Sequence, residues 1–433
     1  MLDSGHSLSS LDALLPFPSC LPPRYQGPIA RHADTGDVRL FKLAYHLSPA
    51  SHDLWNFLMT EEARLHDART EGKTIVGAMK DLGTVPVLTD AFDSAVAFYP
   101  DGAWWLPCFK EQQTRLLAAA DAAGIGDGFC PVRAMLGAFE LKCHFPMPDL
   151  LFCSTGAICD DFKAIAQRLV ERGHAIHFWQ MPHVRDADDG EASIRLPNGR
   201  RVPTVLVDAV EAELAKLTQT LSTHLGEAMT DAKLRGAIHR SNRVRNLLSR
   251  IRNGNLPSLE RLICEMLAIH YCSDYALCEN VLANLVLEGE RPREPPPVLK
   301  PIYWINPVAD IWAMNVLEDA GGRLCGTDFM FTHALTPLDE TLPPLRSLAE
   351  MALQDPMAAP TSARMQACIR DAQRLHAKGI IVSRIPGASH CAFEMSALER
   401  MTELPVLEIE IASVTDAYAP SLLTRIQAFI ENV

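Results

Sequence analysis

Short apolar runs alternate with helical segments in two parts of this chain, and this alternation restricts the fold more than any other sequence feature. In the first part, apolar runs at 74–77, 95–99, 149–153 and 175–179 alternate with helical patterns. The alternation returns after residue 300, with apolar runs at 301–305, 379–383 and 406–411. Strand–helix–strand repeats favour parallel sheets covered by helices. The sequence therefore predicts an α/β protein with two Rossmann-like or flavodoxin-like parallel-sheet lobes.

The rest of the chain is predicted to be mainly helical. Residues 1–70 form an N-terminal arm, which is proline-rich at first and helical from about residue 47, and a proline-rich linker at 291–297 precedes the second lobe. We therefore expect four parts: an N-terminal arm and helix at 1–70, a first α/β lobe at 71–203, a helical insert at 204–290 and a second α/β lobe at 298–433.

Composition limits the partners and the compartment. Forty Lys and Arg against 53 Asp and Glu give a net charge of −13, which argues against nucleic-acid binding because phosphate contacts need a basic surface. The sequence has no apolar run of about 18 residues and no signal-peptide pattern at its start, so we expect a cytoplasmic protein without a membrane span. In a reducing cytoplasm the 12 cysteines serve as core residues, metal ligands or reactive thiols.

Three cysteines stand at the start of predicted helices. Cys130 precedes Pro131, and proline is favoured at the first position of a helix. Cys159 and Cys391 each follow a predicted strand and precede a predicted helix, where open α/β sheets bind ligands. A helix N-terminus stabilises a thiolate, and thiolates bind iron–sulfur clusters. Three thiolates meeting from two lobes would hold a metal cluster with one position open; three unrelated buried or surface thiols are the alternative.

Several segments give the chain a resemblance to the 2-hydroxyacyl-CoA dehydratase / benzoyl-CoA reductase family, from about residue 70 to the C-terminus. Their order and spacing carry the resemblance more than any single one: Phe129-Cys130-Pro131-Val132-Arg133, Pro148-Asp149-Leu150-Leu151 through Ile158-Cys159-Asp160, Thr327-Asp328-Phe329, Lys378-Gly379-Ile380-Ile381 leading to His390-Cys391, and Leu404 to Glu410. The sequence departs from the family at Glu408-Ile409-Glu410, where the family usually has Glu-x-Asp.

The resemblance implies that Cys130, Cys159 and Cys391 hold one [4Fe–4S] cluster. It also implies an acyl-CoA substrate, a heterodimer with a related second subunit, and a separate ATP-dependent iron–sulfur activator that supplies a low-potential electron. An activator of that kind agrees with the incomplete phosphate-loop pattern at Gly72-Lys73-Thr74, because the glycine expected five residues earlier is Asp67.

The implied reaction is the radical elimination of water from an (R)-2-hydroxyacyl-CoA. Four alternatives stay open at this point. The chain could be a benzoyl-CoA reductase-type subunit that reduces an aromatic acyl-CoA ring, or a non-catalytic scaffold subunit of such a complex. It could also be a standalone reductase for small molecules, or a two-lobed protein that closes on an organic ligand without iron.

Residues beside the cysteines are further candidates. His390 is a predicted proton shuttle or hydrogen-bond donor to cluster sulfur. Asp160 is a predicted acid/base group or a stabiliser of the helix start. Arg133 is predicted to bind an acyl-CoA carboxyl or phosphate or a partner carboxylate, with a surface ion pair as the alternative. Arginines in 231–252 could face CoA phosphates, but their spread around the helix favours a solvated face: Arg235, Arg240, Arg243, Arg245, Arg250 and Arg252.

Overall fold

Two four-stranded parallel sheets organise the chain. The first has the strand order β2-β1-β3-β4 and the second has the order β10-β9-β7-β8, and all the strand pairs in both are parallel. Their strands are β1 (Thr74–Met79), β2 (Ala95–Phe98), β3 (Leu150–Ser154), β4 (Ile176–Trp179), β7 (Lys300–Ile305), β8 (Gly322–Asp328), β9 (Gly379–Arg384) and β10 (Val406–Glu410). The predicted α/β class with two parallel sheets is confirmed.

The computed structural model describes residues 19–27, 49–79, 81–104, 113–156, 160–252, 254, 256–289, 298–306, 311–329, 335–385, 387–388, 394–410 and 420–433. Its α-helices are α3 (Pro49–Met59), α4 (Glu61–Thr70), α5 (Val85–Asp90), α7 (Gln113–Ala122), α8 (Ala134–Leu141), α9 (Asp161–Glu171), α10 (Thr204–Leu225), α11 (Asp231–Arg252), α12 (Ser258–Met266), α13 (Tyr275–Gly289), α14 (Ile311–Asp319), α15 (Pro344–Gln354), α16 (Thr361–Arg374), α17 (Glu394–Met401) and α18 (Pro420–Asn432).

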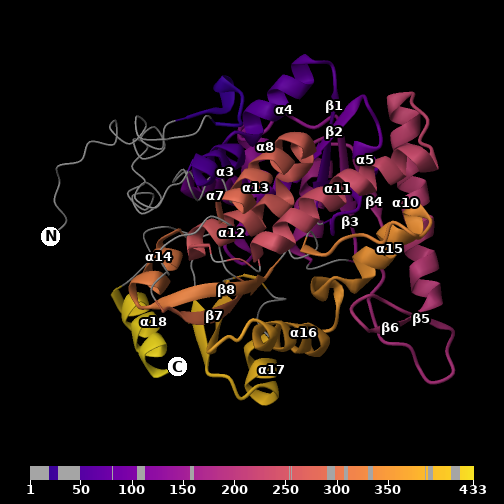
Figure 1. Ribbon diagram of the computed structural model, residues 1–433. Helices are drawn as coiled ribbons and strands as arrows, with labels where there is room; N and C mark the ends of the chain where they lie inside the picture. The colour runs from indigo at the N-terminus through magenta and orange to yellow at the C-terminus, as the bar shows by residue number, and fades with distance from the viewer. Residues whose placement is uncertain are drawn as a thin grey trace.

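Short elements complete the fold. They are the hairpin strands β5 (Ser193–Arg195) and β6 (Arg201–Pro203) and the 3₁₀ turns η3 (Pro23–Tyr25), η5 (Pro100–Trp104), η6 (Pro131–Arg133), η7 (Leu267–Ile269), η8 (Tyr271–Ser273) and η10 (Pro356–Ala358). The hairpin lies beside α10 at one side of the molecule (Figure 1). No helix in the described parts of the chain combines the length and the apolar character that a membrane span requires.

The two sheets have the same topology. If the strands are counted from one to four within each lobe, both sheets have the order 2-1-3-4. In such a sheet the connections leave strands one and three in opposite directions, and ligands bind in the crevice at the carboxyl ends of those two strands. The fold therefore points to the ends of β1 and β3 in one lobe and of β7 and β9 in the other.

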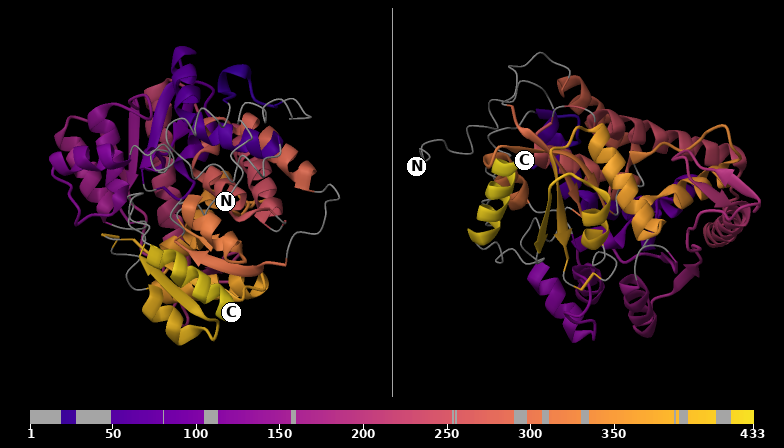
Figure 2. Two further views of the ribbon diagram at one scale, coloured as in Figure 1. Left: turned by 90° about the vertical axis from the view of Figure 1, so that its left-hand side faces the viewer. Right: turned by 90° about the horizontal axis from the view of Figure 1, so that it is seen from below.

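Alternating side chains on the second sheet build two cores. Tyr303 and Ile305 on β7 point into a buried cluster formed with α16 and α17. Ile302 and Trp304, on the opposite face of the same strand, belong to the large core. Both faces of a central parallel strand are therefore covered, as expected for an α/β lobe. Figure 2 shows α18, at the C-terminus, lying along this sheet.

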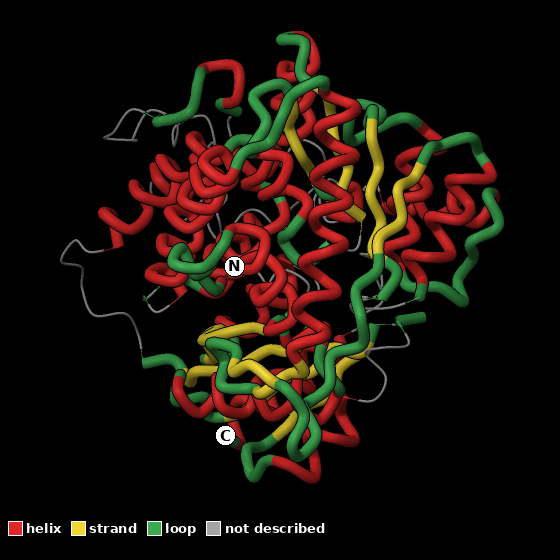
Figure 3. The backbone as a smooth tube through the Cα atoms, turned by 90° about the vertical axis from the view of Figure 1, so that its right-hand side faces the viewer, coloured by secondary structure: helices red, strands yellow, loops and turns green. Residues whose placement is uncertain are grey.

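A helical layer connects the two sheets. Helix α11 packs against α13 and against α5 of the first lobe, while α12 packs against β8 of the second lobe. Figure 3 shows the two groups of strands apart from each other, with helices between them. The buried faces of these helices belong to one continuous core with the first sheet, so the lobes are held together by apolar packing as well as by chain connections.

Two of the predicted helices are interrupted in the structure. The pattern from residue 47 to 69 forms α3 and α4, which are separated at Thr60, whose hydroxyl donates to the Asn56 carbonyl at 2.7 Å. Such a side-chain bond competes with the helical ladder. Within the predicted helical insert at 204–290, the helical pattern over 258–285 is interrupted by η7 and η8, which separate α12 from α13. Strand β8 was not predicted, because its glycines and its polar end do not form an apolar run.

Removing buried volume from the first sheet should destabilise the protein. Leu151 on β3 is 2% exposed, so Leu151→Ala should lower the free energy of unfolding by about 2–5 kcal/mol. Val205 on α10 is 62% exposed, and Val205→Ala should change it by no more than about 0.5 kcal/mol. Guanidinium denaturation of both variants tests this, and equal effects would contradict the packing described for β3.

Candidate functional site

Cys130 begins a helical segment, as the sequence predicts. It is the N-cap of η6, with Pro131 at the first helical position, and η6 continues directly into α8. The residue is 8% exposed and belongs to the large core. Its thiol therefore lies in a desolvated place at the positive end of a helical segment.

The start of α9 is bound directly to this cysteine. The Cys130 backbone N–H donates to Oδ2 of Asp161 at 3.0 Å, and Asp161 is itself buried. Asp161 is the first residue of α9, which begins soon after β3 ends. The predicted ligand Cys159 lies two residues before Asp161, outside the described residues.

A segment of the second lobe touches the same peptide. Gly387, which follows β9, has a φ of +76°, and a Cβ added there would lie 2.5 Å from the carbonyl carbon of Phe129 and 2.9 Å from the nitrogen of Cys130. Only glycine allows both this backbone conformation and this approach. His390 and Cys391 lie three and four residues further on, outside the described residues. Chain segments next to two predicted ligands thus converge on the third.

Asp160 and Arg133 have different surroundings. The Asp160 side chain is 87% exposed, and its Oδ1 lies 2.6 Å from Nζ of Lys163 one turn later in α9, as expected of a residue at a helix start. Arg133 is buried; its Nε lies 3.2 Å from Oδ1 of Asp121, and its Nη1 donates to the Phe129 carbonyl at 3.1 Å. Arg133 thereby braces the peptide that precedes Cys130.

A second group of buried polar residues lies behind Cys130 and escaped the sequence prediction. Nδ1 of His270 lies 2.6 Å from Oε2 of Glu61, and both side chains are buried. The imidazole lies against η5, because a Cβ on Gly102 would be 3.1 Å from its Cε1. Asp101, the neighbour of that glycine, follows β2. Since η5 packs against η6, these groups are one layer away from Cys130.

Three atoms of this group have unused hydrogen-bonding capacity. His270 Nε2, Glu61 Oε1 and Asp101 Oδ1 are buried without a hydrogen-bond partner within the described ranges. Burial raises the pKa of Asp101 to about 7, and the charges of Asp81 and Glu61 act in the same direction. In the described part of the chain no group of three His, Cys, Asp or Glu is arranged to hold a metal ion. The chemistry that these residues offer is therefore proton storage and transfer.

Only weak signals in the sequence could have indicated this group. Asp101 comes shortly after an apolar run, at the carboxyl end of a predicted strand. His270 is a single polar residue inside Leu267-Ala268-Ile269-His270-Tyr271, where a buried and satisfied histidine is the usual outcome. Glu61 is far from both in sequence, so only the fold brings the three together.

The contact at Gly387 should be detectable in the protein's stability. Gly190 also has a positive φ, +81°, but a Cβ there would meet nothing within 4 Å. Gly190→Ala should therefore cost about 1–2 kcal/mol of unfolding free energy from backbone strain alone. Gly387→Ala should cost about 1–3 kcal/mol more, because the Phe129–Cys130 peptide has to move. Equal costs in chemical denaturation would refute the contact.

Asp101 should make stability depend on pH. Its pKa is raised from 3.8 to about 7 by folding, so between these values the native state binds more protons than the unfolded state. Stability then falls as pH rises through this window, by about 1.4 kcal/mol per pH unit for one proton. Asp101→Asn should remove this contribution. The unfolding free energy of the variant minus that of wild type should therefore increase from pH 5 to pH 7. Parallel curves of unfolding free energy against pH would contradict the raised pKa.

Comparison with known proteins agrees with this architecture. The family model described as 2-hydroxyglutaryl-CoA dehydratase, D-component, matches residues 87–433. No curated protein matches the chain. The matched region covers well over half of the sequence and includes every predicted site residue as well as β2–β10. The chain therefore belongs to the 2-hydroxyglutaryl-CoA dehydratase D-component family.

Proposed function

We propose that this chain is the iron–sulfur subunit of a 2-hydroxyacyl-CoA dehydratase-type enzyme, with Cys130, Cys159 and Cys391 as the ligands of one [4Fe–4S] cluster. The observation that carries the proposal is the convergence at Cys130 of Asp161 from one lobe and Gly387 from the other. The family match supports the dehydratase class and ranks dehydration before aromatic ring reduction.

Chain length makes the three thiols compatible with one site. An extended chain spans at most about 3.6 Å per residue. The Cα of Cys159 is therefore within about 7 Å of the Cα of Asp161, and that of Cys391 within about 14 Å of the Cα of Gly387. Because Asp161 and Gly387 both contact the Cys130 backbone, neither thiol needs a rearrangement of the described fold to approach Cys130.

The chemistry of the donors also fits a cluster. Thiolates are the usual protein ligands of [4Fe–4S] clusters, and the helical segment that begins after Cys130 favours the negative charge of a thiolate. Cys159 and Cys391 each follow the third strand of their lobe, β3 and β9, so they occupy equivalent positions in two sheets of equal topology. No disulfide joins the nine cysteines in the described ranges, which supports the proposed reducing, cytoplasmic setting.

The proposed reaction removes the C2 hydroxyl and one C3 proton of an (R)-2-hydroxyacyl-CoA, giving a 2-enoyl-CoA and water without net oxidation. When bound by Cys130, Cys159 and Cys391, the cluster would supply reversible one-electron chemistry to the substrate thioester. An ATP-dependent iron–sulfur activator is the proposed electron donor, and a related second subunit is the proposed partner.

This chain's own residues supply the proton chemistry in our proposal. His390 and Asp160, each adjacent in sequence to a proposed ligand, exchange the protons of the leaving hydroxyl and of C3. The exposed carboxylate of Asp160 is in contact with solvent, so it can pass protons to water. Asp101 and His270 hold a proton one layer behind Cys130, where it is protected from bulk solvent. Arg133 keeps the Phe129–Cys130 peptide in position.

Metal analysis of cysteine variants tests the cluster. Protein purified without oxygen should contain about four irons and four sulfides per chain, with the visible absorption of one [4Fe–4S] cluster. Cys130→Ala, Cys159→Ala and Cys391→Ala should each lose most of this iron. Cys143→Ala is the matched control, because Cys143 is a half-buried free thiol shortly after α8, and it should keep wild-type iron content.

The outcomes separate the competing functions. A folded wild type that stays colourless and iron-free after anaerobic reconstitution would overturn the cluster proposal. A chain that binds iron but forms an inactive complex when its partner and the activator are added would identify a scaffold subunit instead. Turnover of an aromatic acyl-CoA but not of a 2-hydroxyacyl-CoA would identify the reductase alternative.

A further inference from the structure

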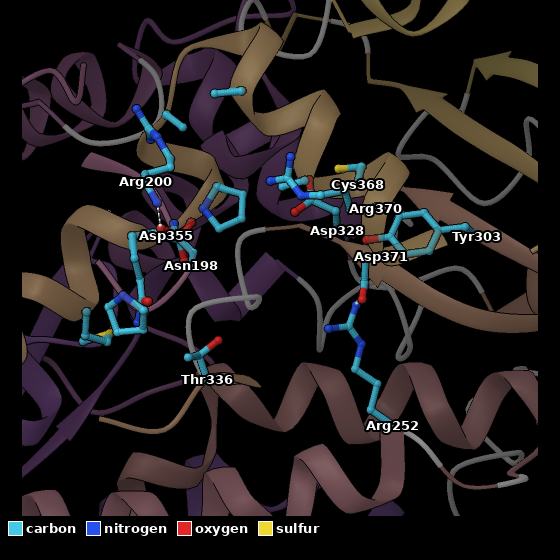
Figure 4. Close-up of a pocket in the computed structure, with 17 residues that line it drawn as sticks. Asn198, Arg200, Arg252, Tyr303, Asp328, Thr336, Asp355, Cys368, Arg370 and Asp371 are labelled. Atoms are coloured by element: carbon cyan, nitrogen blue, oxygen red, sulfur yellow. Dashed lines mark hydrogen bonds and ion pairs between the residues drawn. The ribbon is translucent and has the colours of Figure 1, made fainter. Parts of the chain in front are cut away.

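Three parts of the chain that are distant in sequence line a cavity of about 330 Å³, and the lining includes none of the residues described around Cys130. One wall is the turn of the β5–β6 hairpin, with Asn198 and Arg200. A second is the end of α15 with Asp355, and a third is α16 with Ala363 and Arg370 (Figure 4). The hairpin turn is fixed to α15, because Nδ2 of Asn198 donates to the Gln354 carbonyl at 2.9 Å. This hydrogen bond holds two walls of the cavity together.

Asp355 presents an unused carboxyl oxygen. The residue is 3% exposed, and its Oδ1 accepts the Met357 N–H at 2.7 Å as the N-cap of η10. Its Oδ2 is buried and has no hydrogen-bond partner within the described ranges. The pKa of Asp355 is raised to about 7, mainly by burial. The charge of Asp328 also raises this pKa, whereas the charges of Arg364 and Arg245 lower it. The raised pKa favours the neutral carboxyl, which can donate a hydrogen bond.

Two guanidinium groups from different elements complete the polar lining. Nε and Nη2 of Arg200 lie 3.0 Å from Oδ1 of Asp186, whereas its Nη1 is buried without a hydrogen-bond partner in the described chain. Arg370 is an exposed cation on α16. Arg200, Asp355 and Arg370 line the same cavity from three different elements (Figure 4).

The other charged groups of the lining are already paired. Nη2 of Arg252 lies 2.6 Å from Oδ2 of Asp371, and Nε of Arg364 lies 2.7 Å from Oδ2 of Asp328. What is left is the Nη1 N–H group of Arg200, whose charge is shared with Asp186, together with the exposed Arg370 and the Asp355 carboxyl. A buried guanidinium N–H without a partner costs free energy, and an anion would remove that cost.

We propose that this cavity binds a small organic anion, whose carboxylate or phosphate group is held by Arg200 and Arg370 and accepts a hydrogen bond from the Asp355 carboxyl. Met351, Pro356 and Ala363 give the cavity an apolar side that fits a short carbon chain. Its volume is at the lower end for ligand sites, which suits a small metabolite. This site does not depend on the cluster proposed at Cys130.

Calorimetric titration of the full chain tests the site, with malonate as the carboxylate probe and glycerol 3-phosphate as the phosphate probe. Wild type should bind at least one of them saturably, and the tighter one identifies the anion class. Arg200→Gln and Arg370→Gln should each weaken this binding at least tenfold. Arg374→Gln is the matched control, because Arg374 lies one turn after Arg370 on α16, pairs with Asp371 and does not line the cavity.

The dependence on pH gives a second readout that a folding defect would not produce. The neutral form of Asp355 favours an anion, so affinity should increase when the pH falls from 8 to 6. In Asp355→Asn the amide replaces the neutral carboxyl, so the variant should bind at both pH values and lose this dependence. No saturable binding of either probe by wild type, or equal weakening in Arg374→Gln, would overturn the proposal.

Discussion

The contact of both lobes with one peptide bond, between Phe129 and Cys130, is the constraint around which the candidate site is built. Asp161 reaches the Cys130 N–H from the first lobe, and Gly387 lies against the same peptide from the second. The first contact is a hydrogen bond to a buried carboxylate, and the second leaves no room for a Cβ atom at residue 387. The relative position of the two lobes is therefore specified next to Cys130, and the surrounding apolar core needs only to maintain it.

Buried arginines tie the helical layer to the second lobe. Arg252 at the end of α11 donates to the Thr327 carbonyl and contacts Asp371, and Arg245 donates to the Thr336 carbonyl. The prediction of a solvated arginine face was wrong for these two residues, since Arg245 is fully buried and Arg252 nearly so. A guanidinium satisfies several carbonyls at once, so it can close the polar end of a helix against a sheet. This explains why charged residues lie in a layer that otherwise packs through apolar contacts.

The predictable and unpredictable parts of the structure differ in a physical way. Apolar runs such as 149–153 and 379–383 form buried strands because burial of an apolar run is a local property of the sequence. The helix starts after Cys130 and before Asp161 also follow from local chemistry, proline in the first case and acidic residues in the second. The group of Glu61, Asp101 and His270, by contrast, joins His270 to two residues that lie more than 160 positions earlier in the sequence. No local sequence pattern is common to these three residues, so the group is defined only by tertiary packing.

The equal strand order of the two sheets has a consequence for the symmetry of the proposed centre. A chain made of two equivalent halves can offer ligands in pairs, and the proposed ligands Cys159 and Cys391 would be such a pair, since each follows the third strand of its half in the sequence. Cys130 belongs to the connection between the second and third strands of the first half. In the corresponding connection of the second half the cysteine is Cys368, which is buried in the core between α16 and its sheet. The internal repeat is thus broken at one position, and the proposed four-iron centre would have three thiolates and one corner without a cysteine from the second half to match Cys130. Because the second half has no counterpart of Cys130 at the centre, one iron of the proposed cluster would differ from the other three in having no cysteine ligand.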